Sequence, residues 1–200
     1  MRKYPDLARE WGYEKNNMIL PEQVSVGSHK KVWWKCKQGH EWEAEIKSRV
    51  NGEGCPYCAN KKVLEGYNDL QTFFPELAKE WDYNKNKKMP SQYTRFSNKK
   101  VWWRCKQGHE WEAVISKRTL GRACPYCSNR RILKGYNDLQ TKFPLVAERW
   151  DSQKNGIEAN QVFPFSNKKA WWKCSCGCEW EAVINYMSRK NICPRCGKTN

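Results

Sequence analysis

The sequence predicts three tandem α+β modules, each a β-hairpin preceded by a short helix and crosslinked through two pairs of soft ligands. The first observation is repetition, because the string VWWKCKQGHEWEAEIKSRVNGEGCPYC at Val32 recurs with substitutions at Val101 and Ala170. The second is spacing, since the first cysteine of each copy lies 69 residues from the next. The third is a change inside every copy from helical to alternating hydrophobic periodicity.

A period of 69 residues divides the 200-residue chain into three modules, which we place at residues 1–63, 64–132 and 133–200. A module of this size buries a small core and generally needs a metal ion or disulfides to be stable. The N-terminus lacks the apolar segment of a signal peptide, and no run is long enough to span a bilayer. We therefore expect a cytoplasmic protein with no membrane partner, in which cysteine pairs bind metal.

Each repeat opens with a helical signal that ends in tryptophan, at Pro5–Trp11, Pro75–Trp81 and Pro144–Trp150. Proline is tolerated at the first helical position, and an apolar residue four positions before the tryptophan lies on the same face. This face is expected to be buried in the module core.

The alternating segment that follows predicts a hairpin. Val32, Trp34 and Cys36 share one face of the first strand, and the second strand runs from His40 with its own apolar alternation. A turn through Lys37–Gly39 would place the cysteine and histidine at the hairpin tip, above a layer of tryptophans. Core packing is expected for most of the twelve tryptophans.

Four soft ligands recur in every copy and predict three closed, tetrahedral zinc sites, one per module. The first two copies offer three cysteines and one histidine, and in the third copy Cys178 stands at the histidine position. Histidine and cysteine exchange as zinc ligands but not as core residues or disulfide partners, which leaves an iron–sulfur cluster as the alternative. The predicted ligands are Cys36, His40, Cys55, Cys58, Cys105, His109, Cys124, Cys127, Cys174, Cys178, Cys193 and Cys196.

An eleventh cysteine, Cys176, aligns with Gln38 and Gln107 of the other copies. Its position in the middle of the predicted knuckle favours a spare, exposed thiol. Competition with the predicted ligands for the metal is the alternative.

No segment of the sequence meets the residue requirements of the enzyme class that it resembles, so we expect a protein that is not an enzyme. Cys-Pro-Tyr-Cys occurs in redox enzymes, but here every copy follows a second ligand pair and the third copy reads Cys-Pro-Arg-Cys. A zinc deaminase needs a glutamate two residues after the histidine and an open coordination position. A nuclease-like Glu45–Lys47 segment becomes Val114–Ser116 in the second copy.

The charge balance favours a polyanionic partner. The chain has 37 Lys and Arg against 21 Asp and Glu, a net charge of +16, and three thiolate-bound zinc ions would lower it to about +12. Solubility alone is the alternative. The candidate phosphate contacts recur near the turns and knuckles: Lys30, Lys31, Arg49, Lys61, Lys62, Lys99, Lys100, Arg118, Arg122, Arg130, Arg131, Lys168, Lys169, Arg189 and Lys190.

Three tryptophans, Trp33, Trp102 and Trp171, fall on the opposite face of the hairpin from the metal. We expect the helix to cover them, with base stacking as the alternative. The connectors between copies share Gly-Tyr-Asn-Asp-Leu-Gln-Thr at Gly66–Thr72 and Gly135–Thr141. Their apolar residues predict an ordered strap that docks on a neighbouring module, with free tethering as the alternative.

The combination of a Pro-x-Leu-Ala-x-Glu-Trp helix, Val-Trp-Trp-x-Cys, Gly-His-Glu-Trp-Glu-Ala and Cys-Pro-Tyr-Cys resembles the zinc-ribbon, treble-clef-like tandem repeats of bacteria and their phages. The resemblance covers nearly the whole chain and implies zinc binding, a DNA-binding role and a bacterial or phage-encoded origin. We therefore expect a zinc protein that binds nucleic acid, DNA rather than RNA, mainly through its backbone. The alternative is an adaptor that binds a protein partner, such as a phage-encoded modulator of a host complex.

Overall fold

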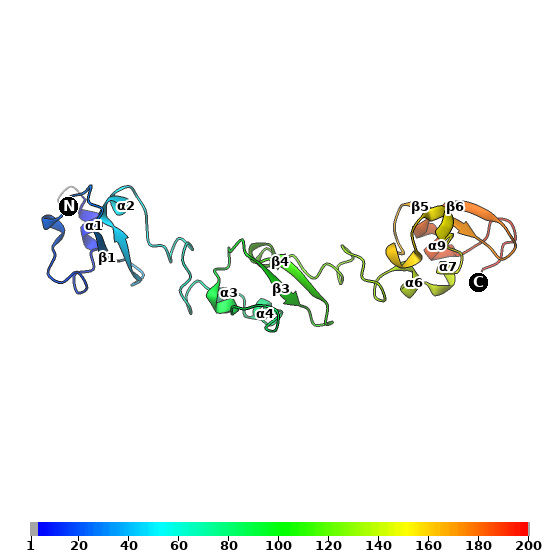
Figure 1. The fold of residues 1–200 in the computed structure, drawn as a ribbon, viewed down its shortest axis with the longest axis horizontal. Helices are drawn as coiled ribbons and strands as arrows, with labels where there is room; N and C mark the ends of the chain where they lie inside the picture. The colour runs from blue at the N-terminus through cyan, green and yellow to red at the C-terminus, as the bar shows by residue number, and fades with distance from the viewer. Residues whose placement is uncertain (1–3, 200) are drawn as a thin grey trace. The chain divides into compact units, whose positions relative to one another are not determined.

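A computed structural model describes residues 4–199 and shows one antiparallel hairpin in each repeat (Figure 1). The hairpins are β1 (Lys31–Lys35) with β2 (Glu41–Glu45), β3 (Lys100–Arg104) with β4 (Glu110–Val114), and β5 (Lys169–Lys173) with β6 (Glu179–Val183). Each strand lies within a residue or two of the bounds that the alternation predicts. The predicted fold class, small zinc-stabilised α+β modules in tandem, is confirmed by these hairpins together with the ligand groups described below.

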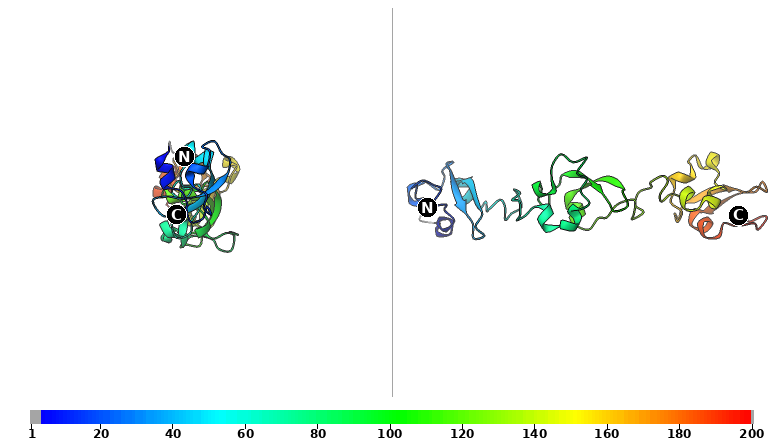
Figure 2. Two further views of the ribbon diagram at one scale, coloured as in Figure 1. Left: turned by 90° about the vertical axis from the view of Figure 1, so that its left-hand side faces the viewer. Right: turned by 90° about the horizontal axis from the view of Figure 1, so that it is seen from below.

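Short helices surround each hairpin, as the views in Figure 2 also show. The predicted opening helices are α1 (Pro5–Arg9), α4 (Pro75–Ala78) and α7 (Pro144–Ala147). The remaining elements were not predicted: α2 (Ile46–Val50), α5 (Ile115–Thr119) and α9 (Ile184–Lys190) after the hairpins, α3 (Leu70–Phe73) and α6 (Leu139–Lys142) in the connectors, α8 (Ser152–Asn155), and the 3-10 turns η1 (Pro21–Gln23), η2 (Pro90–Gln92) and η3 (Ala159–Gln161).

The core of each repeat is a tryptophan cluster under the hairpin tip. In the first repeat Trp34 pairs with Trp42 across the strands and is fully buried, and Val32 pairs with Ala44 on the same face. Trp11, which follows α1, meets the Trp34 ring edge-on with centroids 5.2 Å apart. The same contact recurs at 5.4 Å and 5.2 Å in the other repeats, so aromatic packing fixes the opening helix to the hairpin.

The face of the hairpin opposite the metal is covered by the segment that follows the opening helix, and not by that helix as expected. In the first repeat Lys15 places its ammonium 4.4 Å from the Trp33 ring centroid. Asn16 exchanges two hydrogen bonds with the backbone of Trp33, at 2.9 and 2.8 Å. Corresponding lysines lie 4.2 Å from Trp102 and 4.5 Å from Trp171. Each ring is therefore partly covered by a lysine that follows the opening helix, and in the third repeat this lysine belongs to α8.

The connectors are ordered straps, as predicted, and they dock on the repeat that follows. Leu70 is fully buried, and its amide donates to the Tyr93 carbonyl at 2.8 Å. Asp69 caps α3, accepting from the amides of Thr72 and Gly66 and from the Thr72 hydroxyl at 2.7–2.8 Å. The second connector repeats these bonds through Asp138.

Contacts gather the chain into two compact units, one formed by Met1–Lys106 with Glu112–Gly121 and the other by Gln107–Trp111 with Arg122–Asn200. This grouping does not test the module boundaries at residues 63 and 132, which stay a prediction. Among the helices of residues 4–199, none combines the length and apolar character that crossing a membrane requires.

Replacing Asp69 by alanine is expected to loosen the first connector. Burial would raise the pKa of this carboxyl, but hydrogen bonds from the side chain and backbone of Thr72 and from Gly66 hold it below the ordinary value. Its contribution is therefore complete at neutral pH and is lost as pH falls through the folded-state pKa. Loss of such a cap costs about 1–2 kcal/mol, which denaturant unfolding of the zinc-loaded chain would measure.

The exposed neighbour Gln71 provides the control, and its replacement by alanine should leave stability within about 0.5 kcal/mol. Amide exchange should accelerate at Gly66 and Thr72 in the Asp69 variant alone. Equal stability and equal protection in the two variants would contradict the capping role.

Candidate metal centres

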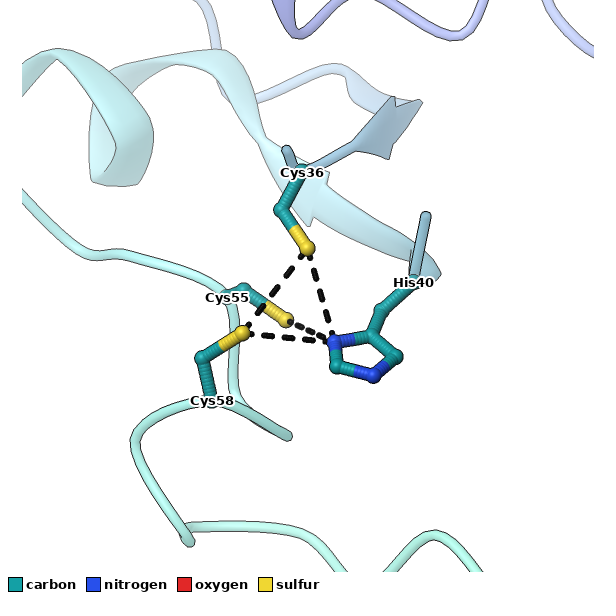
Figure 3. A group of neighbouring side chains, drawn as sticks. All are labelled: Cys36, His40, Cys55 and Cys58. Atoms are coloured by element: carbon teal, nitrogen blue, oxygen red, sulfur yellow. Dashed lines mark hydrogen bonds between the residues drawn. The ribbon is translucent and has the colours of Figure 1, made fainter. Parts of the chain in front are cut away.

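Four ligand atoms converge in the first repeat, where Cys36, His40, Cys55 and Cys58 lie within 4.8 Å of one another (Figure 3). His40 Nδ1 is 3.4 Å from Cys36 Sγ, 3.3 Å from Cys58 Sγ and 3.7 Å from Cys55 Sγ. The sulfurs of Cys36 and Cys58 are 3.8 Å apart. Zinc bonds of about 2.3 Å to sulfur and 2.0 Å to nitrogen imply tetrahedral edges of roughly 3.8 Å and 3.5 Å. The four side chains therefore fit one tetrahedral zinc ion.

Backbone hydrogen bonds orient the first two ligands of the site. The Cys36 amide donates to the His40 carbonyl at 3.0 Å, and the Gly39 amide donates to the Cys36 carbonyl at 2.8 Å. Gly39 has a φ of 82°, a left-handed conformation that glycine adopts without the strain of a Cβ. The sequence thus builds a tight knuckle that presents both ligands on one side.

The second repeat offers the same ligand set, Cys105, His109, Cys124 and Cys127, within 4.8 Å. His109 Nδ1 lies 3.2 Å from Cys127 Sγ and 3.7 Å from Cys124 Sγ. The geometry of the first site is therefore repeated with the imidazole at the same vertex.

The third site gathers a set of thiols that differs from the predicted set in one member. The structure gathers Cys174, Cys176, Cys193 and Cys196, with Cys176 in place of the predicted Cys178. Cys176 Sγ is 3.8 Å from Cys193 Sγ, and Cys174 Sγ is 3.7 Å from Cys196 Sγ. Sequence alignment matches only Cys178 to the histidines of the other repeats, whereas Cys176 lies two residues earlier on the same knuckle.

Tyrosines flank the first two sites, and sequence reasoning missed them. Tyr67 of the connector meets the His40 ring with centroids 4.0 Å apart, and its hydroxyl donates to Cys58 Sγ at 3.9 Å. Tyr57, inside the second knuckle, lies 5.8 Å from the same imidazole. Tyr136 and Tyr126 repeat these contacts on His109. Each connector therefore touches the metal site of the repeat before it.

The Cys58 thiol of the first site resists ionisation. Burial, followed by the neighbouring Cys55 and Cys36 thiols, raises the pKa of Cys58 to about 11. Thiolate is the form that binds zinc, so binding must displace protons and strengthens as pH rises. A cation at the centre supplies the charge that the site needs to hold ionised thiols together.

Most of the candidate phosphate contacts lie on the surface, and none of them is a metal ligand. Thirteen of the fifteen are exposed: Lys30, Lys31, Lys61, Lys62, Lys99, Lys100, Arg122, Arg130, Arg131, Lys168, Lys169, Arg189 and Lys190. Two of them pair with glutamates of the hairpin, Lys100 with Glu112 at 2.8 Å and Lys169 with Glu181 at 3.6 Å. The other two candidates are core residues.

Arg49 and Arg118 are the two candidates that the structure removes from the surface. The Arg49 side chain is 6% exposed, pairs with Glu10 and lies 5.1 Å from the Trp34 ring centroid. Arg118 is 4% exposed and pairs with Glu80 in the same way. Neither guanidinium is available to a phosphate. Arginine buries readily when it stacks on aromatic rings and pairs with a carboxylate, which is what each core provides.

The sequence of the third repeat contains evidence for the Arg49–Glu10 ion pair, because both of its partners are replaced there. Met187 occupies the position of Arg49 and is fully buried, while Arg149 occupies that of Glu10. Arg149 is 2% exposed and donates to the Lys198 carbonyl at 2.9 Å. Loss of the arginine with simultaneous loss of the carboxylate indicates an internal ion pair.

A family described as "Probable Treble clef zinc finger domain" matches residues 7–61, 77–130 and 146–199. These three segments cover most of the chain. The chain belongs to this treble-clef family. The predicted resemblance and the three-fold repetition are thereby confirmed, and the three ligand groups support three zinc ions per chain.

One curated relative is a protein of Escherichia phage T5 named "Putative endonuclease", 30% identical over 106 residues. The alignment covers 52% of this chain and 34% of that protein. The aligned segment, about half of this chain, therefore spans about a third of the length of this relative.

Metal analysis should find three zinc ions per chain. Removing zinc with a chelator is expected to abolish the near-ultraviolet circular dichroism of the buried tryptophans, because the metal joins the hairpin tip to the second knuckle above them. Re-addition of zinc should restore the signal. Retention of the tryptophan signal in the metal-free chain would show that the cores fold without the crosslink.

Replacing Arg49 by alanine should lower the free energy of unfolding by about 2–3 kcal/mol. This loss is smaller than the loss from breaking a fully buried ion pair, because water can reach the remaining Glu10 carboxylate. The double change Arg49→Met with Glu10→Arg, which copies the third repeat, should recover part of this loss. Guanidinium unfolding provides the measurement, with the exposed Arg9→Ala as control. Unchanged stability with weaker DNA binding would instead restore Arg49 as a phosphate contact.

Proposed function

We propose that this chain is a non-catalytic, zinc-dependent nucleic-acid-binding protein of the cytoplasm that contacts the phosphate backbone, with duplex DNA favoured over RNA. The observation that carries the proposal is the recurrence of exposed cations at corresponding places beside each zinc-bearing hairpin. The net charge of +16 stays near +12 after three zinc sites form, and such a basic chain attracts polyanions.

The lysine pairs before the hairpins are held on ordered backbone. The Lys30 amide donates to the Ser28 hydroxyl at 3.1 Å, and its carbonyl accepts from the Ile46 amide at 3.2 Å. Lys99 and Lys168 have the same serine contact at 3.2 Å. Cations on a rigid turn lose little conformational entropy when they meet phosphate, which favours binding through these loops.

The second knuckle offers a further pre-ordered cation. Arg130 donates to the Ala123 carbonyl at 2.6 Å and to the Ser128 hydroxyl at 2.9 Å, while its side chain stays on the surface. Arg131 follows it, and Lys61 and Lys62 occupy the equivalent positions in the first repeat. The candidate phosphate contacts thus gather on the turns and knuckles.

The outer face of the hairpin is a poorer phosphate site. Glu41 pairs with Lys15 at 2.6 Å and with Lys35 at 3.5 Å, and the hydrogen bond from Lys15, followed by its charge and that of Lys35, lowers the Glu41 pKa. Lysines on this face are therefore already neutralised by neighbouring carboxylates. This arrangement favours the turns over the strands as the contact surface.

The ligand groups support a structural role for zinc. Each offers four protein ligands, and a site filled in this way leaves no open position for a reacting water. The phage relative is named an endonuclease, and the segment it shares with this chain is a third of its length. We propose that the shared segment serves nucleic-acid contact, with cleavage residing elsewhere in that protein.

A protein-binding adaptor is the second candidate, and one apolar groove favours it. The groove has a volume of about 500 Å³ and is lined by Phe143, Phe163, Pro164 and Phe165. Phe165 is 55% exposed. A stoichiometric protein partner that remains bound after nuclease treatment, and is lost with Phe165→Ser, would favour this function over nucleic-acid binding.

Affinity for duplex DNA should fall steeply with salt. Six to ten phosphate contacts predict a loss of about 10³–10⁵-fold between 50 and 200 mM salt. Fluorescence anisotropy with duplex DNA, duplex RNA and single strands would measure the slope for each. No binding at low salt, or a flat salt response, would sink the proposal.

Neutralising Lys30 and Lys31 together to glutamine should weaken binding and reduce the logarithmic salt slope by about 1–2, because each lost contact releases about one counterion fewer. Lys79→Gln is the control, since this exposed lysine follows the opening helix α4 at its C-cap, away from the turns, and pairs with Glu76. Equal losses in the control and test variants would indicate a general charge effect rather than a defined contact surface.

A further inference from the structure

The third metal site has more thiols than a tetrahedral ion can bind. Cys174, Cys193 and Cys196 occupy the positions of the three cysteines in the other repeats, while Cys176 and Cys178 both lie on the knuckle between the strands. Five thiols are therefore available for the four coordination positions of one ion. The first two repeats have glutamine at the position of Cys176, so this excess is specific to the third.

Geometry favours Cys176 as the fourth ligand. Its sulfur lies 3.8 Å from Cys193 Sγ, which is the edge of a tetrahedron with zinc–sulfur bonds of about 2.3 Å. It belongs to the group whose ligand atoms all lie within 4.8 Å of one another. No movement of the backbone is needed for it to complete the site.

The fold of the knuckle favours Cys178 equally. The Cys174 amide donates to the Cys178 carbonyl at 2.9 Å, and the Gly177 amide donates to the Cys174 carbonyl at 2.9 Å. These are the bonds that hold Cys36, Gly39 and His40 in the first repeat, so Cys178 leaves the backbone at the point from which His40 reaches its ligand position. A spacing of three residues between ligands is also ordinary for zinc knuckles.

The second knuckle of the third repeat has a cation in place of an aromatic side chain. Arg195 stands where Tyr57 and Tyr126 flank the histidines of the other repeats. A positive charge beside a thiol favours its ionised form.

We propose that Cys176 and Cys178 are interchangeable as the fourth ligand of the third zinc ion, so that one of the two thiols always stands free beside an intact metal site. The exchange needs only rotation of two side chains on one knuckle, with Cys174, Cys193 and Cys196 unchanged. The free thiol reacts with thiol-directed electrophiles or binds soft metal ions. When one of the two cysteines is modified, the other still binds the zinc.

Cobalt substitution in the full chain tests the exchange. Cobalt(II) takes zinc's position, and its thiolate charge-transfer absorption grows with the number of bound thiolates. Cys176→Ser and Cys178→Ser should each keep three metal ions and the absorption of the unmodified chain, while the double variant should lose the contribution of one thiolate. A loss in only one of the single variants, or none in the double variant, would overturn interchangeability.

Alkylation of the zinc-loaded chain gives an independent measurement. Treatment with limiting iodoacetamide followed by peptide mass spectrometry should find a single label per chain, divided between Cys176 and Cys178. Label confined to one of them would show a fixed ligand and a fixed spare thiol. Label on any of the other three thiols of the site would likewise contradict the proposal.

The first repeat offers a matched transplant. His40→Ala removes a protein ligand, and Gln38 occupies the position of Cys176. Adding Gln38→Cys to His40→Ala should restore a fourth protein ligand and increase the thiolate absorption of cobalt above that of the unmodified chain. If the added cysteine leaves the spectrum of His40→Ala unchanged, a thiol at this knuckle position does not reach the metal.

Discussion

The convergence of four ligands at each hairpin tip is the constraint on which the rest of each repeat depends. Two come from the turn between the strands and two from a knuckle about fifteen residues further along the chain. A metal bond between these segments closes a loop that a small core could not hold shut by burial alone. The tryptophans under the tip can then pack in one arrangement, and the lysine turns at the other end of the hairpin keep a fixed geometry.

Much of this arrangement could be predicted from the sequence, because period and ligand spacing are local properties. Alternation placed Trp34 and Trp42 on the metal-bearing face, where the structure pairs them, and repetition identified the ligand groups. The short helices after the hairpins escaped prediction, since segments of five to seven residues such as α2 and α9 have too few turns to show a helical period. Their stability comes from tertiary contacts, which a local pattern does not record.

Two details of the structure depend on side-chain contacts that a sequence pattern does not record. Arg49 looked like a surface cation until its guanidinium was found between Trp34 and Glu10. Cys178 aligns with the histidines of the other repeats, and the structure brings Cys176 among the ligand atoms of the third site. In both cases the third repeat differs from the other two at two positions at once. Such joint changes reveal structural contacts that a change at a single position does not.

The connector allows the number of repeats to increase in evolution by simple duplication. Tyr67 rests on the histidine of the repeat before it, while Leu70 is buried against the repeat after it. Each 69-residue period therefore contains one hairpin and one complete joint. Duplication of a single period would supply a new zinc site together with the contacts that attach it. An array of this kind can lengthen by unequal recombination without any new interface having to evolve.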